Sequence, residues 1–286
     1  MSVNVYQMVT DRILEQMSNG IIPWHKPWHG TLDGAISYVS RKPYSILNQF
    51  LLGEAGEYLT FNQIKSLGGK LKKGSKSKFV VFYKPIEIKK KAGGEEDDDK
   101  RSTEVIPMLR FYNVFHLKDT EGIPTKIQEE DRPKLEPIAE ADKIISDYVD
   151  REKLDYRVQK SDSAYYRPSD DMVVVPLIEQ YDVVEEFYST AFHELVHSTG
   201  HKSRLNRFEC AIAFRSENYS REELVAEIGS SMLSNIAGIN HDKSFRNSVA
   251  YIQGWASALK SEPKLIVSAS SRAEKATKYI LGEITQ

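Results

Sequence analysis

Two histidines four residues apart, with a glutamate between them, carry the clearest chemical signal in this sequence. They belong to the pentad His193-Glu194-Leu195-Val196-His197. Apolar residues recur at helical spacing through residues 183–195, so the pentad is predicted to lie on a helix. Residues four apart share one helix face, so both imidazoles can bind one metal ion. Glu194 is then placed to accept a proton from a metal-bound water, as in a zinc hydrolase.

The alternative for this pentad is a chance match on an ordinary amphipathic helix. The chain has seven histidines, however, and His193, His197 and His201 all lie in this short stretch. Asp182 followed by Glu185 predicts a capped start of the helix, and Gly200 predicts its end. The clustering of histidines on a bounded helix favours a metal site.

A catalytic zinc site needs a third protein ligand. In one zinc-binding pattern a histidine follows the second histidine by six residues, but Ser203 occupies that position here. His201 lies just beyond the predicted helix end. We therefore expect His201 near the site, as a hydrogen-bonding residue and not as a ligand.

A later helix, predicted over residues 221–236, offers the third ligand instead. Its helical wheel places Glu223, Glu227, Ser230 and Ser234 on one face. A solvated face is the alternative, but this face carries no Lys or Arg, and its serines are small enough for a neighbouring helix to approach. We predict Glu223 as the third ligand and Glu227 as an acceptor for the free N–H of a ligand histidine. The reverse assignment of the two glutamates stays open.

These residues imply a metal-assisted hydrolysis. Zinc, or another divalent transition metal such as manganese, would lower the pKa of its water and polarise a carbonyl group. Glu194 would take the proton from that water and pass it to the leaving amine. Tyr219 is a candidate for stabilising the oxyanion by its position alone; the alternative is a packing residue at the helix N-terminus.

The length and composition allow two soluble domains. A chain of 286 residues can form two domains, each large enough to bury a core. Its one cysteine, Cys210, excludes an intramolecular disulfide and a cysteine-based metal cluster, which fits a reducing compartment. No apolar run approaches the ~20 residues that span a bilayer. We expect a cytoplasmic protein without membrane contact, and a monomer.

The charge is divided unevenly along the chain. Residues 1–128 hold 19 Lys and Arg against 14 Asp and Glu, whereas the remainder holds 20 against 27. Lysines for phosphates, interleaved with aromatic rings for bases, are typical of single-strand binding. The alternatives are a solvated lysine face and tryptophans buried in a core. The predicted DNA-binding residues are Trp24, Lys26, Trp28, Lys42, Lys65, Lys72, Lys73, Lys76, Lys78 and Tyr83.

Helical and alternating patterns give the order of the elements. In the first domain, residues 1–128, we expect helices at 5–17, 44–53 and 60–67 and strands at 78–83 and 109–116. The run at 89–104 mixes charges of both signs with glycine and predicts a mobile loop. A linker at 129–137 leads to the second domain, 138–286. That domain is expected to be mainly helical with a small sheet, its helices at 138–149, around the pentad, and at 221–236, 246–260 and 263–281.

Taken together, these segments resemble the ArdC-type antirestriction proteins. The matching pieces in the first half are residues 5–11, 20–28, 60–64 and 68–74, and those in the second half are residues 166–176, 193–201, 222–227 and 250–255. The acidic run at 95–99 is not part of the family pattern. The resemblance implies an α+β protein with an α/β domain that binds single-stranded DNA and a mainly α, zincin-like (gluzincin-like) metallopeptidase domain with a small sheet.

The resemblance also implies a role on a mobile genetic element, spread by conjugation, in shielding incoming DNA from host restriction. The helix at 222–233 is similar to the third-ligand helix of thermolysin-like gluzincins, and that likeness also puts the ligand at Glu223 and the supporting acid at Glu227. Two other functions stay open. One is a protease that acts on DNA-bound or regulatory host proteins; the other is a DNA-binding protein whose metal site is purely structural. Glu194 favours a water-activating site over a structural one.

Overall fold

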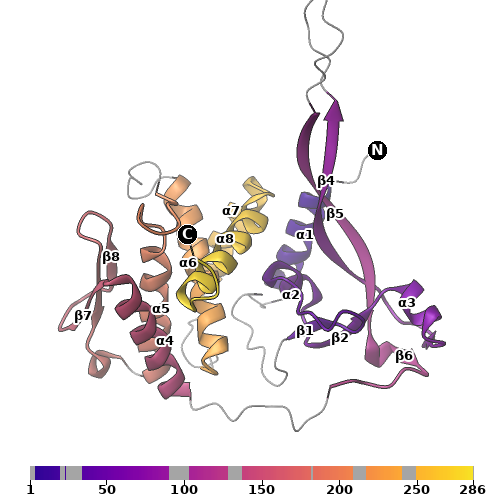
Figure 1. The fold of residues 1–286 in the computed structure, drawn as a ribbon, viewed down its shortest axis with the longest axis horizontal. Coiled ribbons are helices and arrows are strands. Elements are labelled where there is room, and N and C mark those ends of the chain that lie inside the picture. Colours follow the sequence, from indigo (N-terminus) through magenta and orange to yellow (C-terminus); the bar gives the residue numbers. More distant parts are fainter. Residues whose placement is uncertain are drawn as a thin grey trace, which may run out of the picture.

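The computed structural model describes residues 4–19, 23, 34–89, 103–127, 137–181, 183–208, 217–239 and 249–285. The first half mixes helices and strands (Figure 1). Its elements in chain order are α1 (Val5–Ser18), β1 (Ala35–Ser37), α2 (Ile46–Leu52), β2 (Gly56–Leu59), α3 (Phe61–Ser66), β3 (Lys70–Leu71), β4 (Lys78–Lys89), β5 (Thr103–His116), the short 3-10 helix η1 (Leu117–Asp119) and β6 (Thr120–Glu121).

The second half is mainly helical, as expected. Its elements are α4 (Pro137–Glu152), β7 (Asp155–Gln159), β8 (Tyr165–Arg167), β9 (Met172–Pro176), the 3-10 helix η3 (Ile178–Gln180), α5 (Val184–Ser198), α6 (Glu217–Ile236), α7 (Val249–Ser261) and α8 (Leu265–Ile280). In the small sheet, β9 lies between β7, which is parallel to it, and β8, which is antiparallel. All of β9 is buried, because its Val-rich run packs against α5.

Local capping explains where two helices of the first half begin. The side chain of Asn4 accepts a hydrogen bond from the backbone N–H of Gln7 and so starts α1. Thr60 and Gln63 form a reciprocal capping box at α3. Both helices begin within one residue of their predicted starts, residues 5 and 60.

The start of α5 differs from its prediction. Val183 is the N-cap residue and its side chain forms no cap hydrogen bond, while the predicted cap, Asp182, lies outside the described residues. Packing sets this boundary, because Phe187 and Ala191 of the first turns are buried in the core. Gly200 follows the helix as predicted. A side chain is excluded at this position for a steric reason, because a Cβ there would lie 2.6 Å from the ring of Phe208.

The main sheet of the first half has the strand order β1-β2-β5-β4. β1 and β2 are parallel, and the other pairs are antiparallel. β4 and β5 are far longer than β1 and β2, so they continue past the sheet as a two-stranded ribbon (Figure 1). Pairing reaches Lys89↔Thr103. The predicted loop at 89–104 is therefore wrong at its ends, which are strand, and its residues 90–102 lie outside the described residues.

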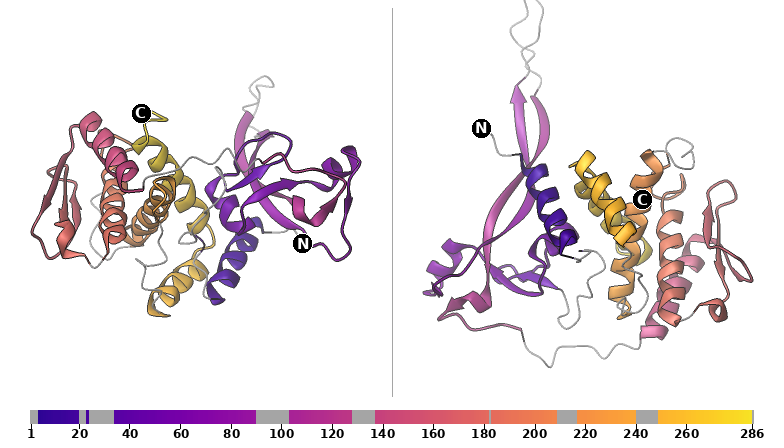
Figure 2. Two further views of the ribbon diagram at one scale, coloured as in Figure 1. Left: turned by 90° about the horizontal axis from the view of Figure 1, so that it is seen from below. Right: turned by 180° about the vertical axis from the view of Figure 1, so that it is seen from behind.

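The two halves share one continuous hydrophobic core. Val9 and Ile13 of α1 belong to the same buried cluster as Leu195 of α5 and Ile266 of α8. In Figures 1 and 2, α1 lies between the ribbon on one side and α7 and α8 on the other. Polar contacts also join the halves: the Thr10 hydroxyl donates to the carbonyl of Pro263 at 2.9 Å. The two halves are thus packed together at this junction, while two smaller buried clusters lie wholly in the first half.

Helix α6 lies between α5 and α8. The predicted polar face is enclosed at Ser230 and Ser234, which are buried as completely as Val225 and Ile228 on the opposite face. The small side chains let α5 come close, and the Ser230 hydroxyl donates to the carbonyl of Ser189 in that helix at 2.7 Å. Among the described residues, none of the helices is both long and apolar enough to cross a membrane.

Candidate metal centre and nucleic-acid surface

The packing of α5 against α6 brings the two pentad histidines to a glutamate. His193 and His197 lie one turn apart on α5, and their Nε2 atoms are 3.1 Å apart. Glu223 reaches them from α6, with Oε2 at 3.6 Å from His193 Nε2 and Oε1 at 3.3 Å from His197 Nε2. One ligand atom from each of the three residues lies within 4.8 Å of the others. Two imidazoles and a carboxylate at this spacing are the donor set of a gluzincin-type metal centre.

A buried ion pair lies directly behind His197. Glu222 Oε1 is 3.8 Å from His197 Nδ1, on the side of the ring away from Glu223. The guanidinium of Arg207 donates to Glu222 at 2.6 Å and to the carbonyl of Val196 at 2.8 Å. It also donates to the Thr199 hydroxyl at 2.7 Å. Arg207 therefore ties the end of α5 to the start of α6, which fixes the separation of the histidines from Glu223.

The electrostatics of the triad suit a cation. Burial alone would lower the pKa of His197, but the carboxylates of Glu222 and Glu223 outweigh it and raise the pKa to about 10. Burial would likewise raise the pKa of Glu223, but hydrogen bonds to His193 and His197 lower it well below its usual range. Negative charge therefore surrounds the imidazole pair, and these three side chains fit a divalent metal ion in both geometry and charge.

Glu194 lies between the two histidines on α5 and is buried, with 8% of its surface exposed. Its charge acts on the imidazole of His197 and on the phenol of Tyr181. A cavity of about 320 Å³ opens beside His193. Its lining residues all carry polar groups, and they are Tyr181, Glu186, Ser189, Thr190, His193, Glu227 and Ser230.

The remaining predicted site residues are placed as follows. Glu227 lines the cavity that also borders His193. The carboxylate nearest Nδ1 of His197, the ring nitrogen away from Glu223, is that of Glu222. The imidazole of His201 forms a hydrogen bond with Ser203 at 2.7 Å in the turn after α5. Tyr219 falls in the first turn of α6, and its side chain is not among those that the structure describes.

Sequence reasoning missed Glu222, Arg207 and Tyr181. Glu222 carries a weak signal, since it adjoins Glu223, but Arg207 has no fixed spacing from the pentad. Tyr181 precedes α5 and is brought to the cavity by the turn after η3.

Most of the predicted DNA-binding lysines of the described residues lie on α3 and in the turn from β3 to β4, and Lys42 lies between β1 and α2. Lys42, Lys65, Lys72, Lys73 and Lys76 are exposed. Lys78 is half-buried, and its ammonium donates to the carbonyl of Leu52 at 2.6 Å. Trp24, Lys26 and Trp28 lie outside the described residues.

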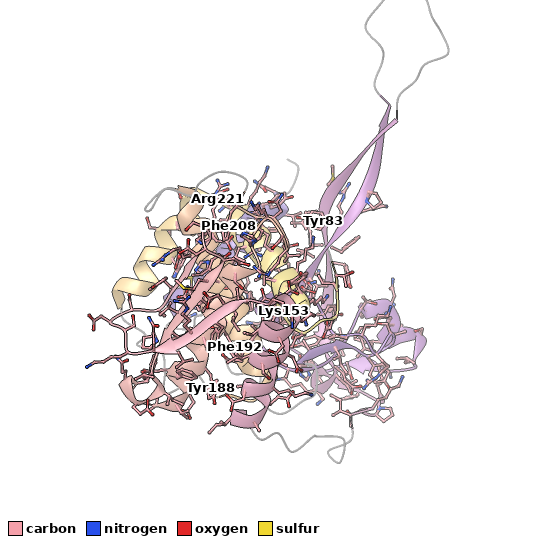
Figure 3. The ribbon with its side chains drawn as sticks, turned by 60° about the vertical axis from the view of Figure 1, so that its left-hand side comes forward. Tyr83, Lys153, Tyr188, Phe192, Phe208 and Arg221 are labelled. Atoms are coloured by element: carbon pink, nitrogen blue, oxygen red, sulfur yellow. The ribbon has the colours of Figure 1, made fainter. Side chains whose placement is uncertain are left out.

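Tyr83 points to the opposite side of the ribbon from its neighbour Phe82, because side chains alternate along a strand. Tyr83 is 52% exposed, and partial desolvation together with the nearby Tyr6 of α1 raises the pKa of its phenol to about 12. Figure 3 shows Tyr83 at the ribbon, outside the core region around Phe192. The sequence patterns did not single out Arg110 and Tyr112, which are exposed on the Phe82 side.

Two family models match this chain, one in each half. The N-terminal domain of anti-restriction factor ArdC matches residues 3–115, and a zincin-like metallopeptidase matches residues 141–272. The metal-free crystal structure of the antirestriction ArdC protein from the R388 plasmid has a TM-score of 0.74 and 30% identity to this chain. That match covers 99% of this chain and 100% of the other.

The chain belongs to the ArdC family of antirestriction proteins. The family confirms the predicted α+β fold class, with an ArdC N-terminal domain and a zincin-like domain. A Mn(II)-bound structure of the R388 protein matches with a TM-score of 0.72 at 30% identity, over 98% of both chains. This structure and the zincin-like match agree with the predicted divalent cofactor, zinc or manganese.

Two further proteins are similar in sequence to this chain. The DNA primase TraC of Escherichia coli is 30% identical over 96% of this chain, but the chain spans only 27% of the primase's length. An uncharacterized protein of Sinorhizobium fredii is 28% identical, over 95% of this chain and 90% of its own length. This chain thus spans most of one relative and about a quarter of the length of the other.

Proposed function

We propose that this ArdC family member binds single-stranded DNA through its first half and shields it from restriction, and that its second half is a metal-dependent peptidase. The convergence of His193, His197 and Glu223 within 4.8 Å supports the second part. The ArdC N-terminal match and the exposed lysines of α3 and the β3–β4 turn support the first.

The residues of the second half divide the chemistry among them. His193, His197 and Glu223 would hold a divalent ion, which would supply Lewis-acid chemistry by lowering the pKa of a water and polarising a carbonyl. Glu194 acts as the proton acceptor for the attacking water and as the donor to the leaving amine. Arg207 and Glu222 hold His197 in its orientation. The cavity beside His193 receives a side chain next to the scissile bond.

The experiment that tests this proposal is a restriction-protection assay. Purified wild type and Glu194→Gln are each bound to DNA and challenged with a restriction enzyme. Glu194→Gln should bind DNA like wild type, because it leaves the first half and the metal ligands unchanged. Protection that persists in this variant indicates that the first half acts by occupying DNA. Protection that is lost while binding stays indicates that hydrolysis of a host protein is the mechanism.

A second candidate function is a protease that acts on DNA-bound or regulatory host proteins. The cavity beside His193 favours it, because a purely structural metal site needs no space for a substrate. Casein and a restriction-enzyme subunit are suitable test substrates. Cleavage of either one by wild type, with none by Glu194→Gln, would support the protease. A protein that keeps its metal but cleaves no substrate and still protects DNA would support a structural metal.

A further inference from the structure

One face of the β4–β5 ribbon, the covered face, packs on α1 at its middle, although Tyr83 and Phe111 on that face stay exposed. The other, the open face, is exposed beyond Val80, which is itself buried. On the covered face, Val81 and Leu109 are buried and belong to the same cluster as Val9 and Ile13 of α1. The open face is defined by the register pairs Val80↔Tyr112, Phe82↔Arg110 and Lys84↔Met108. We call its five exposed side chains the ring face: Phe82, Lys84, Met108, Arg110 and Tyr112.

We propose that the ring face is a stacking platform for single-stranded DNA. The bases stack on the rings of Phe82 and Tyr112, and the phosphates that flank them bind Arg110 and Lys84. This inference rests on the single-stranded DNA binding proposed above, and it names a surface outside the lysine-rich segments that the sequence indicated.

The two rings are exposed and adjacent. Phe82 is 41% and Tyr112 is 40% exposed. Their centroids are 5.6 Å apart, with the planes tilted by 59°. Tyr112 also lies near Tyr44, because Tyr112 contributes to the raised pKa of the Tyr44 phenol. A preordered pair of rings binds bases with little loss of side-chain entropy.

The charge on this face suits a polyanion. The described side chains that the register places here, from Lys78 to Lys84 and from Met108 to Val114, include three cations and no carboxylate. Lys78 is engaged by Leu52 and Glu54 at the base. Arg110 and Lys84 are exposed, and neither forms an ion pair with a described residue. Cations beside exposed rings are the combination that binds phosphates and bases together.

The shape of the ribbon favours a single strand over other ligands. In Figures 1 and 2 the ribbon extends beyond the helical half, so a long ligand can lie along it without meeting α7 or α8. Bases inside a duplex already stack on one another and are not available to these rings. A peptide that adds a strand would use the free edge of β4 and not the ring face, because backbone groups lie at edges.

The test uses the full-length chain and a fluorescently labelled oligothymidylate. Phe82→Ala should weaken binding at least about fivefold, as expected for the loss of one stacked base. Arg110→Ala should reduce the slope of log K against log salt by about 0.7, the value for one phosphate contact on a single strand. The matched controls are Phe111→Ala, a 37% exposed ring on the opposite face, and Arg157→Ala in the second half; both should bind like wild type.

Two further measurements keep the result unambiguous. Thermal unfolding of each variant, followed by circular dichroism, should match wild type, because the replaced side chains are exposed. Photocrosslinking of unmodified protein to an oligonucleotide that contains 5-iodouracil should give an adduct at Phe82 or Tyr112. A wild type that binds no oligothymidylate overturns the proposed function itself. A wild type that binds, with Phe82→Ala and Arg110→Ala equally tight or with adducts only elsewhere, overturns the ring face alone.

Discussion

Glu222 and Glu223 are neighbours in the sequence but occupy different environments. Successive residues on a helix point about 100° apart, so the two carboxylates leave α6 in different directions. Glu223 is partly exposed and reaches the Nε2 atoms of both histidines. Glu222 is buried, approaches the Nδ1 side of His197, and is neutralised by Arg207. At the scale of single residues, one carboxylate suits metal binding and the other suits orientation of a ligand.

The first prediction concerns the metal ligands. Purified protein should bind about one divalent ion per chain, as zincins do. His193→Ala, His197→Ala and Glu223→Ala should each lose the ion, because two ligands do not hold it. Glu194→Gln should keep the ion and serves as the matched control. Metal content by mass spectrometry checks this, and retention in Glu223→Ala with loss in Glu227→Ala would reverse the roles of the two glutamates.

The second prediction concerns Arg207. Arg207→Ala leaves the buried carboxylate of Glu222 without its cation, so the free energy of unfolding should fall by roughly 3–5 kcal/mol. Metal affinity should also fall, by about 10- to 100-fold, because His197 loses its support. Urea unfolding and metal titration measure the two effects. Adding Glu222→Gln should restore part of the stability, and a double variant no more stable than Arg207→Ala contradicts the buried-charge explanation.

At the scale of elements, the site depends on how closely α5 and α6 approach. Gly229 of α6 faces Val196 of α5, and a Cβ at Gly229 would lie 2.8 Å from a methyl carbon of that valine. Because Val196 precedes His197 and Gly229 follows Glu223 on the same helix, this contact influences the distance between ligands. The glycine permits a helix separation that a larger residue would increase.

The third prediction tests that contact. Gly229→Ala should destabilise the protein by about 1–3 kcal/mol, since overpacking outweighs the better helix propensity of alanine. It should also weaken metal binding. Gly254→Ala in α7 is the matched control, because a Cβ there meets no atom within 4 Å; it should be neutral or stabilising by up to about 1 kcal/mol. Denaturant unfolding of both variants decides, and equal effects would refute the steric argument.

A second buried ion pair joins several elements of the second half. Arg204, after α5, donates to both oxygens of Asp171 at 2.7 and 2.8 Å and to Glu152 of α4 at 3.2 Å. Tyr166 of β8 donates to the same aspartate at 2.9 Å. The end of the pentad helix is thereby fixed to α4 and to the small sheet.

The fourth prediction is the pH dependence of this network. Burial alone would raise the pKa of Asp171, but hydrogen bonds from Arg204 and Tyr166 outweigh it and lower the pKa. A lowered folded-state pKa means that the ion pair contributes full stability above the ordinary aspartate value of about 3.9. That contribution is lost as the pH falls through the folded-state value. Between neutral and acidic pH, the free energy of unfolding measured with urea should therefore fall less in Asp171→Asn than in wild type. An identical fall in both proteins would contradict this role of the ion pair.

At the scale of the whole molecule, the two halves are joined by packing as well as by the chain. Val9 and Ile13 of α1 share a core with α8, and the backbone N–H of Ile46 at the start of α2 donates to Glu274 of α8 at 3.2 Å. The ammonium of Lys264 lies 5.5 Å from the centre of the Tyr6 ring. The first half and the second half therefore depend on each other for burial of apolar surface.

The fifth prediction follows from this shared core. Residues 1–128 produced alone should unfold at a lower denaturant concentration than the full chain and should bind a hydrophobic dye, because the faces of α1 and α2 that α8 covers become exposed. The full chain should unfold in a single transition. A fragment as stable as the full chain, or two separate transitions in the full chain, would show that the halves fold independently.

How much the sequence determined can be judged from particular residues. Local patterns predicted the helix of the pentad, the face shared by Glu223 and Glu227, and the helix that begins near Thr60. Each of these features follows from a local period or a local hydrogen bond. The lengths of β4 and β5 were underestimated, because ladder hydrogen bonds between partners extended the strands into a segment whose composition predicts a loop.

Other features were decided only in three dimensions. The spacing of residues in the sequence does not predict that Arg207 pairs with Glu222, because the pair depends on which elements pack together. It does not predict that Arg110 and Tyr112 are exposed beside Phe82 either, because that depends on which face stays uncovered. The same holds for the shared core, because an apolar helix face does not specify its partner. Local patterns therefore fixed which side chains could perform the chemistry, while long-range packing fixed their distances, their charges and the surfaces left open to a ligand.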